Sequence, residues 1–298
     1  MAYKDRIKPE LLRIYEILLT RTKISKDAYY YFLNLKKGFD GESLFDEYTK
    51  QFKIDHLFLN DLQLEVRNSS FQIDALMIST KVLVLYEIKN FEGLYHWGKE
   101  KFTRTSGTFL ENPTMQLEKT KVRLELLLLE KGYSLKVEAY VIFVNPEFTL
   151  LGAPSDANFI LPSQILGHFR NVQAPAQLNA EQIKLAEMLA NQHDPIYPRK
   201  NPQYNYSDLS KGIICPECGT LSKIYSGYFH SCNKCGKKVN VKKAIQSSIE
   251  DFRTLFPKDK LTSSCIMDWC SCGNQKRIYR ILRNDYQIIG KNRGRYYG

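Results

Sequence analysis

Apolar residues recur at two different spacings along the first 90 residues. Over residues 5–36 they return every three or four positions, which predicts one or two amphipathic helices. A further helix is expected over residues 42–52, after Gly41, because glycine disfavours a helix interior. The spacing then shortens to two, which is typical of strands. Strands are predicted over residues 56–67, 71–80 and 82–89.

Helix and strand alternate in the next hundred residues. Asn112-Pro113 opens a predicted helix that Gly132 ends, and residues 137–145 follow as a buried strand. Two more helical stretches are expected near residues 162–170 and 179–192. The order predicts a mixed α/β core of the type αβββαβ.

The last third of the chain differs in pattern. Residues 193–210 are rich in Pro, Tyr, Asn and Gln without periodicity, which indicates a linker. Helices are then predicted over residues 244–256, 261–270 (capped by Thr262 or Ser263) and 274–286, followed by a basic β-wing over 287–298. This order resembles a winged helix-turn-helix, which inserts one helix into the major groove of DNA.

The net charge of +11 lies entirely in that last third. Residues 211–298 hold 17 basic and 6 acidic residues, whereas residues 1–210 hold 26 of each. An excess of this kind favours a nucleic-acid partner, here DNA, over a basic surface that only maintains solubility. The residues expected to face DNA are Gln275, Lys276, Arg277, Arg280, Arg283, Lys291, Arg293 and Arg295.

Four of the seven cysteines form two CxxC pairs. Cys215 and Cys218 precede Cys232 and Cys235 by 13 intervening residues, and a glycine follows each pair. This spacing predicts a four-sulfur structural Zn²⁺ site, with a redox dithiol as the alternative. The remaining three cysteines, Cys265, Cys270 and Cys272, are expected to be core thiols.

Composition narrows the class of protein. A chain with 43% hydrophobic and 25% charged residues is typical of globular proteins. The apolar runs are far shorter than the roughly 20 residues of a membrane span, and the first residues lack the apolar core of a signal peptide. We therefore expect a cytoplasmic protein without a membrane partner. The oligomeric state is not indicated.

Charged residues interrupt two of the predicted strands. Asp74 lies within FQIDALMIST, and Glu87 and Lys89 lie two positions apart within VLVLYEIKN, on one face of that strand. If the two strands pair, two carboxylates and one ammonium converge. Buried carboxylates need a compensating cation, and Mg²⁺ or Mn²⁺ prefers oxygen ligands. The alternative is a Glu–Lys ion pair at a strand end beside a polar core Asp.

Four segments occur in a characteristic order, namely KGFDGE, QIDALMIS, YEIKNFEG and NPTMQ. In this order they resemble the nuclease-related domain family, NERD, a branch of the PD-(D/E)xK nuclease-like superfamily, over about residues 37–152. The resemblance implies a restriction-endonuclease-like core in which Asp74 and Glu87 bind the metal and Lys89 is the catalytic lysine. It also implies that Glu42 is an accessory acidic residue and that Gln116 lies beside the active site. Alternatively, Glu42 only favours its helix N-terminus and Gln116 is a surface residue.

The pattern as a whole predicts six segments. They are an N-terminal helical segment (1–36), the NERD domain (37–152), a helical extension (153–192), the linker (193–210), a zinc ribbon (211–240) and the winged module (241–298). The function expected is metal-dependent hydrolysis of DNA phosphodiester bonds. The alternatives are a catalytically inactive DNA-binding or regulatory protein, and an RNA-directed or protein-interaction role for the ribbon.

Overall fold

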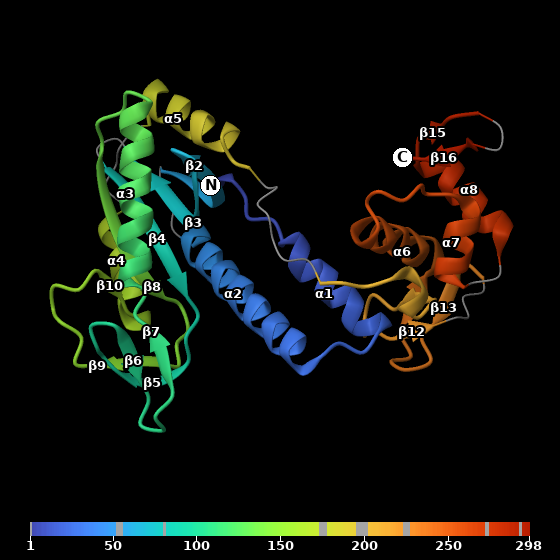
Figure 1. Cartoon of the computed structure of the whole chain (residues 1–298), viewed down its shortest axis with the longest axis horizontal. Coiled ribbons are helices and arrows are strands. Elements are labelled where there is room, and N and C mark those ends of the chain that lie inside the picture. Colours follow the sequence, from blue (N-terminus) through green and yellow to red (C-terminus); the bar gives the residue numbers. More distant parts are fainter. Residues whose placement is uncertain are drawn as a thin grey trace. The chain divides into compact units, whose positions relative to one another are not determined.

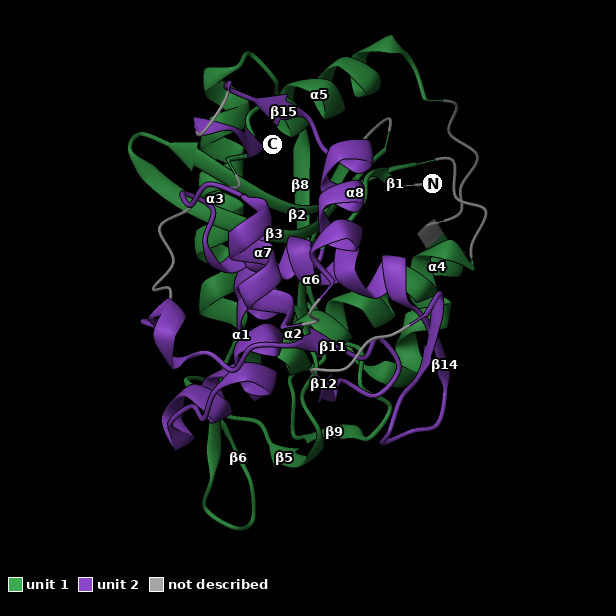
Figure 2. Cartoon of the chain, turned by 90° about the vertical axis from the view of Figure 1, so that its right-hand side faces the viewer, with its two compact units in different colours: residues 1–7, 34–198 green, residues 8–33, 199–298 purple. Residues whose placement is uncertain are grey.

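The chain forms two compact units, each built from two separate stretches of sequence. The structure is a computed structural model that describes residues 2–51, 56–79, 82–172, 178–194, 202–222, 227–271, 274–291 and 294–298. Unit 1 comprises residues 1–7 and 34–198, and unit 2 comprises residues 8–33 and 199–298 (Figure 2).

Unit 1 is organised around a six-stranded sheet. Its strand order is β1-β2-β3-β4-β8-β10, with β2, β3 and β4 antiparallel and the other neighbours parallel. The strands are β1 (Ala2–Lys4), β2 (Leu57–Val66), β3 (Ser69–Ile78), β4 (Val82–Lys89), β8 (Lys136–Phe143) and β10 (Phe159–Ile160). The three predicted strands and the later buried strand are thus confirmed.

Helices cover both faces of this sheet (Figure 1). On one face, α3 (Thr114–Glu130) and α5 (Ala180–Asn191) bury leucines against β2, β3 and β4. On the other face, α2 (Lys26–Lys50) and α4 (Ile165–Val172) pack Phe45 and Phe169 beside Tyr86. The apolar surface buried on both faces stabilises the sheet. Residues of β4 contribute to the apolar clusters on both faces, as expected for a central strand.

Three strands of a second, smaller sheet lie between β4 and α3 in sequence, and its fourth strand follows β8. This sheet has the order β7-β6-β5-β9, with β5 (Gly93–His96), β6 (Lys101–Thr103), β7 (Phe109–Glu111) and β9 (Phe148–Leu151). The αβββαβ order is therefore present, with β5, β6 and β7 as an interruption that the sequence pattern did not predict. The segment from Phe91 to Glu111 alternates too briefly for a period-two signal to stand out.

Helix α2 corrects one prediction. A break at Gly41 was expected, but α2 runs without interruption from Lys26 to Lys50. A Cβ atom at position 41 would lie 2.4 Å from the Cβ of Asn90, so glycine allows the helix to approach the end of β4 closely. Gly41 thus serves packing rather than helix termination.

Unit 2 has a single apolar core built from helices and short hairpins. Its helices are α1 (Glu10–Arg21), α6 (Val241–Leu255), α7 (Ser263–Cys270) and α8 (Gln275–Asp285). Its hairpins pair β11 (Ile213–Ile214) with β12 (Leu221–Ser222), β13 (Phe229–Ser231) with β14 (Lys238–Asn240), and β15 (Ile288–Ile289) with β16 (Tyr296–Tyr297). The three predicted tail helices are confirmed, and Thr262 caps α7 by accepting a hydrogen bond from the Cys265 amide.

Two N-terminal segments join different cores. Residues 2–4 form β1 beside β2 in unit 1, a strand that was not predicted. Helix α1 instead buries Ile14, Ile17 and Leu18 in the core of unit 2. Its last residue, Arg21, is buried there with its guanidinium 3.7 Å from the centre of the Trp269 ring.

Part of the segment expected to be a linker is packed. Residues 195–201 lie outside the described residues, and a short 3-10 helix follows at Tyr206–Asp208. Tyr204 donates a hydrogen bond to the carbonyl of Leu255, and the Tyr206 ring contacts Phe252 and Trp269. This stretch belongs to the core of unit 2. No helix in the described part of the chain has the length and apolar character needed to cross a membrane.

Candidate active site and metal centre

Asp74 and Glu87 lie opposite each other where two strands separate. The β3–β4 ladder pairs Leu76 with Leu85 and Ala75 with Tyr86, and its next position would pair Asp74 with Glu87. The ladder stops there, and the carboxylate of Asp74 accepts a hydrogen bond from the Ile88 amide at 2.9 Å. A side chain thus replaces a backbone partner and brings one carboxylate to the end of β4.

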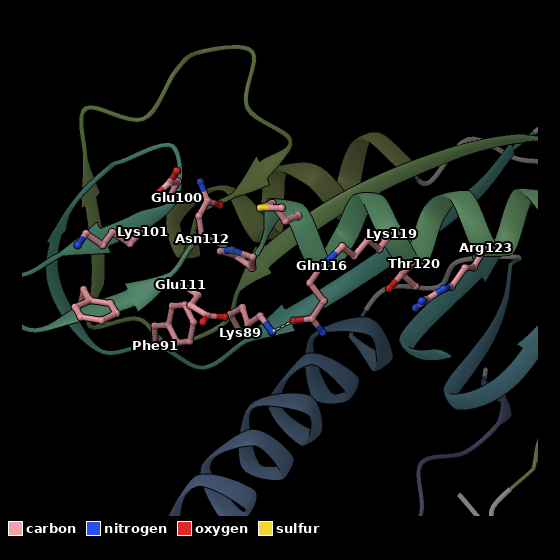
Figure 3. A pocket seen from close by; sticks show the side chains of 13 residues that line it. Lys89, Phe91, Glu100, Lys101, Glu111, Asn112, Gln116, Lys119, Thr120 and Arg123 are labelled. Atoms are coloured by element: carbon pink, nitrogen blue, oxygen red, sulfur yellow. Dashed lines mark hydrogen bonds between the residues drawn. The ribbon is translucent and has the colours of Figure 1, made fainter. Parts of the chain in front are cut away.

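Glu87, Lys89 and Gln116 form a chain of polar contacts. The Lys89 ammonium donates to the Glu87 carboxylate at 2.7 Å. It also donates to the Gln116 side-chain oxygen at 3.2 Å (Figure 3). Leu83 and Leu85 of β4 belong to the core that α3 covers, so the period of two directs Glu87 and Lys89 to the same side. Gln116 lies in the first turn of α3, at the end nearest these residues.

Glu42 reaches the same region from helix α2, together with a residue that the sequence did not single out. The Arg6 guanidinium donates to the Glu42 carboxylate at 2.6 Å, to the Asp46 carboxylate at 3.0 Å and to the Asp74 carbonyl at 2.9 Å. Its side chain is only 3% exposed. Arg6 follows β1 directly, and no local pattern marks it. The sequence gives only a weak indication of Asp46, which lies four residues after Glu42 and therefore on the same face of the helix.

Burial and the Asp74 carboxylate disfavour the charged forms of Glu42 and Glu87. Burial and the neighbouring Asp74 raise the pKa of Glu87 to about 8, against a lowering by Lys89. Burial and Asp74 likewise raise the pKa of Glu42 to about 8, against Arg6. The pKa of Asp74 is raised by burial, against Lys89 and its hydrogen bond from Ile88. Negative charge at this site is therefore only partly compensated by the chain itself.

This arrangement is chemically suited to a hard divalent cation. Mg²⁺ is commonly held by one or two carboxylates with water completing its shell, and Asp74 and Glu87 provide those two groups. A cation would also offset the charge that raises their pKa values. Across the residues that the structure describes, however, these acids do not form a group of three with ligand atoms within 4.8 Å. These residues therefore suit a divalent cation that is bound by few protein ligands.

A pocket of about 870 Å³ opens beside Lys89 and Gln116 (Figure 3). Helix α3 forms one wall, and the β6–β7 hairpin forms another. Its lining residues are Lys89, Phe91, Glu100, Lys101, Phe109, Glu111, Asn112, Pro113, Met115, Gln116, Lys119, Thr120 and Arg123. The polar cluster at the end of β4 is thus reachable from solvent.

The four predicted zinc ligands converge in unit 2. The Sγ atoms of Cys215, Cys218, Cys232 and Cys235 all lie within 4.8 Å of one another. The Cys218–Cys232 distance is 3.6 Å, and the Cys215–Cys235 distance is 4.0 Å. A tetrahedral Zn²⁺ with Zn–S bonds of about 2.3 Å needs sulfurs separated by about 3.8 Å. The cluster therefore fits a structural metal such as zinc.

The other cysteines lie apart from this cluster. Cys270 is buried in the core of unit 2, and Cys265 packs partly buried against it. Cys272 lies outside the described residues.

Two of the residues expected to contact DNA, both on α8, line a groove. Arg277 and Arg280 line a groove of about 440 Å³ with Lys242, Lys243 and Tyr228, whose side chain is 88% exposed. The rest of the expected set on this helix is exposed, namely Gln275, Lys276 and Arg283. Lys291 and Arg295 flank the β15–β16 hairpin, whereas Arg293 lies outside the described residues.

A mixed α/β sheet with an acidic cluster at the end of a central strand is consistent with a nuclease-like core. Residues 37–144 match the family model NERD, described as the nuclease-related domain. This part of the chain is therefore similar to the nuclease-related domain, within the region where the sequence motifs indicated the resemblance. No curated protein and no solved structure matched the chain.

Proposed function

We propose that this protein is a metal-dependent nuclease that hydrolyses DNA phosphodiester bonds. The observation that carries the proposal is the convergence of Asp74, Glu87 and Lys89 at one strand end inside the region that matches the nuclease-related domain. Glu42 and Gln116 reach the same place from the helices on either side of the sheet. Residues from four elements would thus contribute to one site.

In the proposed reaction, Asp74 and Glu87 hold the metal, with Glu42 as an accessory acid. Bound Mg²⁺ or Mn²⁺ would stabilise charge on the scissile phosphate and lower the pKa of a coordinated water. The Lys89 ammonium orients the attacking water and offsets charge developing on the phosphate. The Gln116 side chain fixes the Lys89 ammonium and is placed to donate its amide hydrogens to a phosphate oxygen.

We further propose that unit 2 recruits the DNA. The order α6, α7, α8 and a terminal hairpin resembles that of a winged helix-turn-helix, in which α8 would be the helix for the major groove. Arg277, Arg280 and Arg283 supply long cationic side chains for phosphates and base edges. The zinc-bound cysteines would hold the β11–β12 and β13–β14 hairpins against this module.

A second candidate is a DNA-binding protein whose nuclease-like unit is inactive. The ion pairs favour it, because Arg6 contacts Glu42 and Lys89 contacts Glu87 without a metal. In that case, the acidic cluster would only stabilise the fold.

Cleavage of plasmid and single-stranded DNA in Mg²⁺ or Mn²⁺ distinguishes the two candidates. We expect wild type to cleave and Lys89→Ala to lose at least about a hundredfold in rate. Lys136→Ala is a matched control, because Lys136 pairs with Glu138 at the same spacing on β8 but is exposed. Absence of cleavage by purified wild type over a range of metals would favour the inactive DNA-binding protein.

A further inference from the structure

The pocket beside Lys89 extends along helix α3, which lines it with two cationic side chains one helical turn apart. Gln116, Lys119 and Arg123 all line it, at positions three and seven residues apart on one helix face (Figure 3). At about 1.5 Å rise per residue, Arg123 lies about 10.5 Å along the helix from Gln116. The helix therefore presents cations at increasing distance from the catalytic lysine.

These two cations are available to a ligand. In the described part of the chain, neither Lys119 nor Arg123 forms an ion pair or a side-chain hydrogen bond, in contrast to Lys121, which pairs with Glu125 on the same helix. Unpaired cations in a concave site attract anions, and a chain of phosphates would meet them in succession.

The opposite wall offers an aromatic surface. Phe109 on β7 is 59% exposed although it lines the pocket, and the Lys101 ammonium lies 4.8 Å from its ring centre. On the α3 side, Met115 in the first turn of the helix is also exposed, at 61%. Glu100 and Glu111 also lie on the hairpin side, so phosphates are favoured on the α3 side and repelled from the hairpin.

We propose that this pocket binds unpaired nucleotides of single-stranded nucleic acid, with phosphates along Lys119 and Arg123 and one base stacked on Phe109. A cationic wall facing an aromatic platform is the arrangement with which proteins bind single strands. A base that covers the Phe109 ring cannot remain stacked within a duplex. The inference rests on the proposed function, because the scissile phosphate at Lys89 sets where the strand begins.

Photocrosslinking tests the site independently of cleavage. The full chain is irradiated with a short oligonucleotide containing 5-iododeoxyuridine, in buffer without divalent metal, and crosslinks are mapped by mass spectrometry. We expect a crosslink at Phe109 with the single strand and little with the matching duplex. Arg123→Ala should reduce its yield at least about fivefold and lower the salt dependence of binding by about 0.7 in log–log slope. Lys121→Ala, which removes a charge from the same helix outside the pocket, should change neither.

A second measurement tests Phe109 by kinetics instead of by crosslinking. Phe109→Ala should raise the KM for single-stranded DNA at least about fivefold with little change in kcat, and Phe109→Trp should restore it. Crosslinks confined to unit 2, or equal yields with single strand and duplex, would overturn the inference even if wild type cleaves DNA. A Phe109 crosslink in a protein that cleaves nothing would support the binding site while refuting the nuclease function.

Discussion

The guanidinium of Arg6 contacts the carboxylate of Glu42 at 2.6 Å and so places a cation of the chain itself beside the proposed metal site. The same guanidinium donates to the backbone carbonyl of Asp74. Arg6 therefore links strand β1, helix α2 and strand β3. It contacts the acidic cluster without a metal and would compete with a bound metal for Glu42.

Replacing this cation should make the protein more dependent on metal. We expect Arg6→Gln to lower the free energy of unfolding by about 2 kcal/mol in metal-free buffer, because a buried charge-assisted contact is lost. Mg²⁺ should then raise the Tm of the variant more than that of wild type. Lys36→Gln, which removes an exposed pair with Asp40, is the control and should leave both values unchanged. Equal Mg²⁺ responses in Arg6→Gln and wild type would show that Arg6 and metal do not compete.

The raised pKa values of Glu42 and Glu87 predict a pH dependence of stability. Both pKa values are about 8 in the folded protein, against an ordinary value of 4.5. Between these pH values the folded state holds more protons than the unfolded state, so stability without metal should fall as pH rises. Thermal unfolding from pH 5 to 8.5 checks this against the double variant Glu42→Gln/Glu87→Gln, whose profile should be flatter. An identical slope in the variant would contradict it.

Metal affinity should rise with pH, whereas stability without metal should fall. A metal binds the deprotonated carboxylates, so Mg²⁺ affinity should increase between pH 6.5 and 8.5 as the two protons are released. Titration calorimetry in two buffers of different ionisation enthalpy measures both the affinity and the protons released. Affinity that does not change with pH would place the metal elsewhere.

The cysteine cluster predicts a zinc content that depends on individual thiols. Cys215→Ser should lose about one equivalent of zinc and destabilise unit 2, because Cys215 and Cys232 belong to its core. Cys265→Ser removes a thiol outside the cluster and should keep the metal. Metal analysis of the purified variants checks both outcomes, and an unchanged zinc content in Cys215→Ser would eliminate the site.

Substitution on α8 should weaken DNA binding mainly through charge. We expect Arg280→Ala to lower affinity severalfold and to reduce the salt slope on duplex DNA by about 0.9, the value for one lost phosphate contact. Arg253→Ala removes an exposed arginine of α6 that pairs with Glu250 and should have little effect. Equal losses in the two variants would indicate a diffuse charge effect rather than contact through α8.

Local patterns predicted much of the fold and the core of the candidate site. Period-two alternation identified β2, β3 and β4, and the spacing of Glu87 and Lys89 placed both on one face because strand geometry is local. In the tail, amphipathic periodicity and the cap at Thr262 identified α6, α7 and α8. The cysteine spacing likewise anticipated the cluster.

Contacts between distant segments had no such signal. Arg6 lies 36 residues before Glu42, and its burial depends on β1 pairing with β2. Gly41 carries the usual signature of a helix break, yet its close approach to Asn90 keeps the helix continuous, so tertiary packing overrides local propensity. The assignment of α1 to unit 2 depends on apolar contacts that only the folded chain reveals.

Because the chain alternates between its two units, truncation cannot separate them cleanly. A fragment trimmed to residues 37–144 would lose Arg6 and half of α2, and a fragment beginning at residue 211 would expose the surface that α1 covers. Each half has to be reassembled from two pieces instead, with residues 1–7 bridged to 34–198 and residues 8–33 bridged to 199–298. If a simple deletion fragment is poorly soluble, the expected cause is therefore the loss of part of its hydrophobic core, and not an inability of the complete unit to fold.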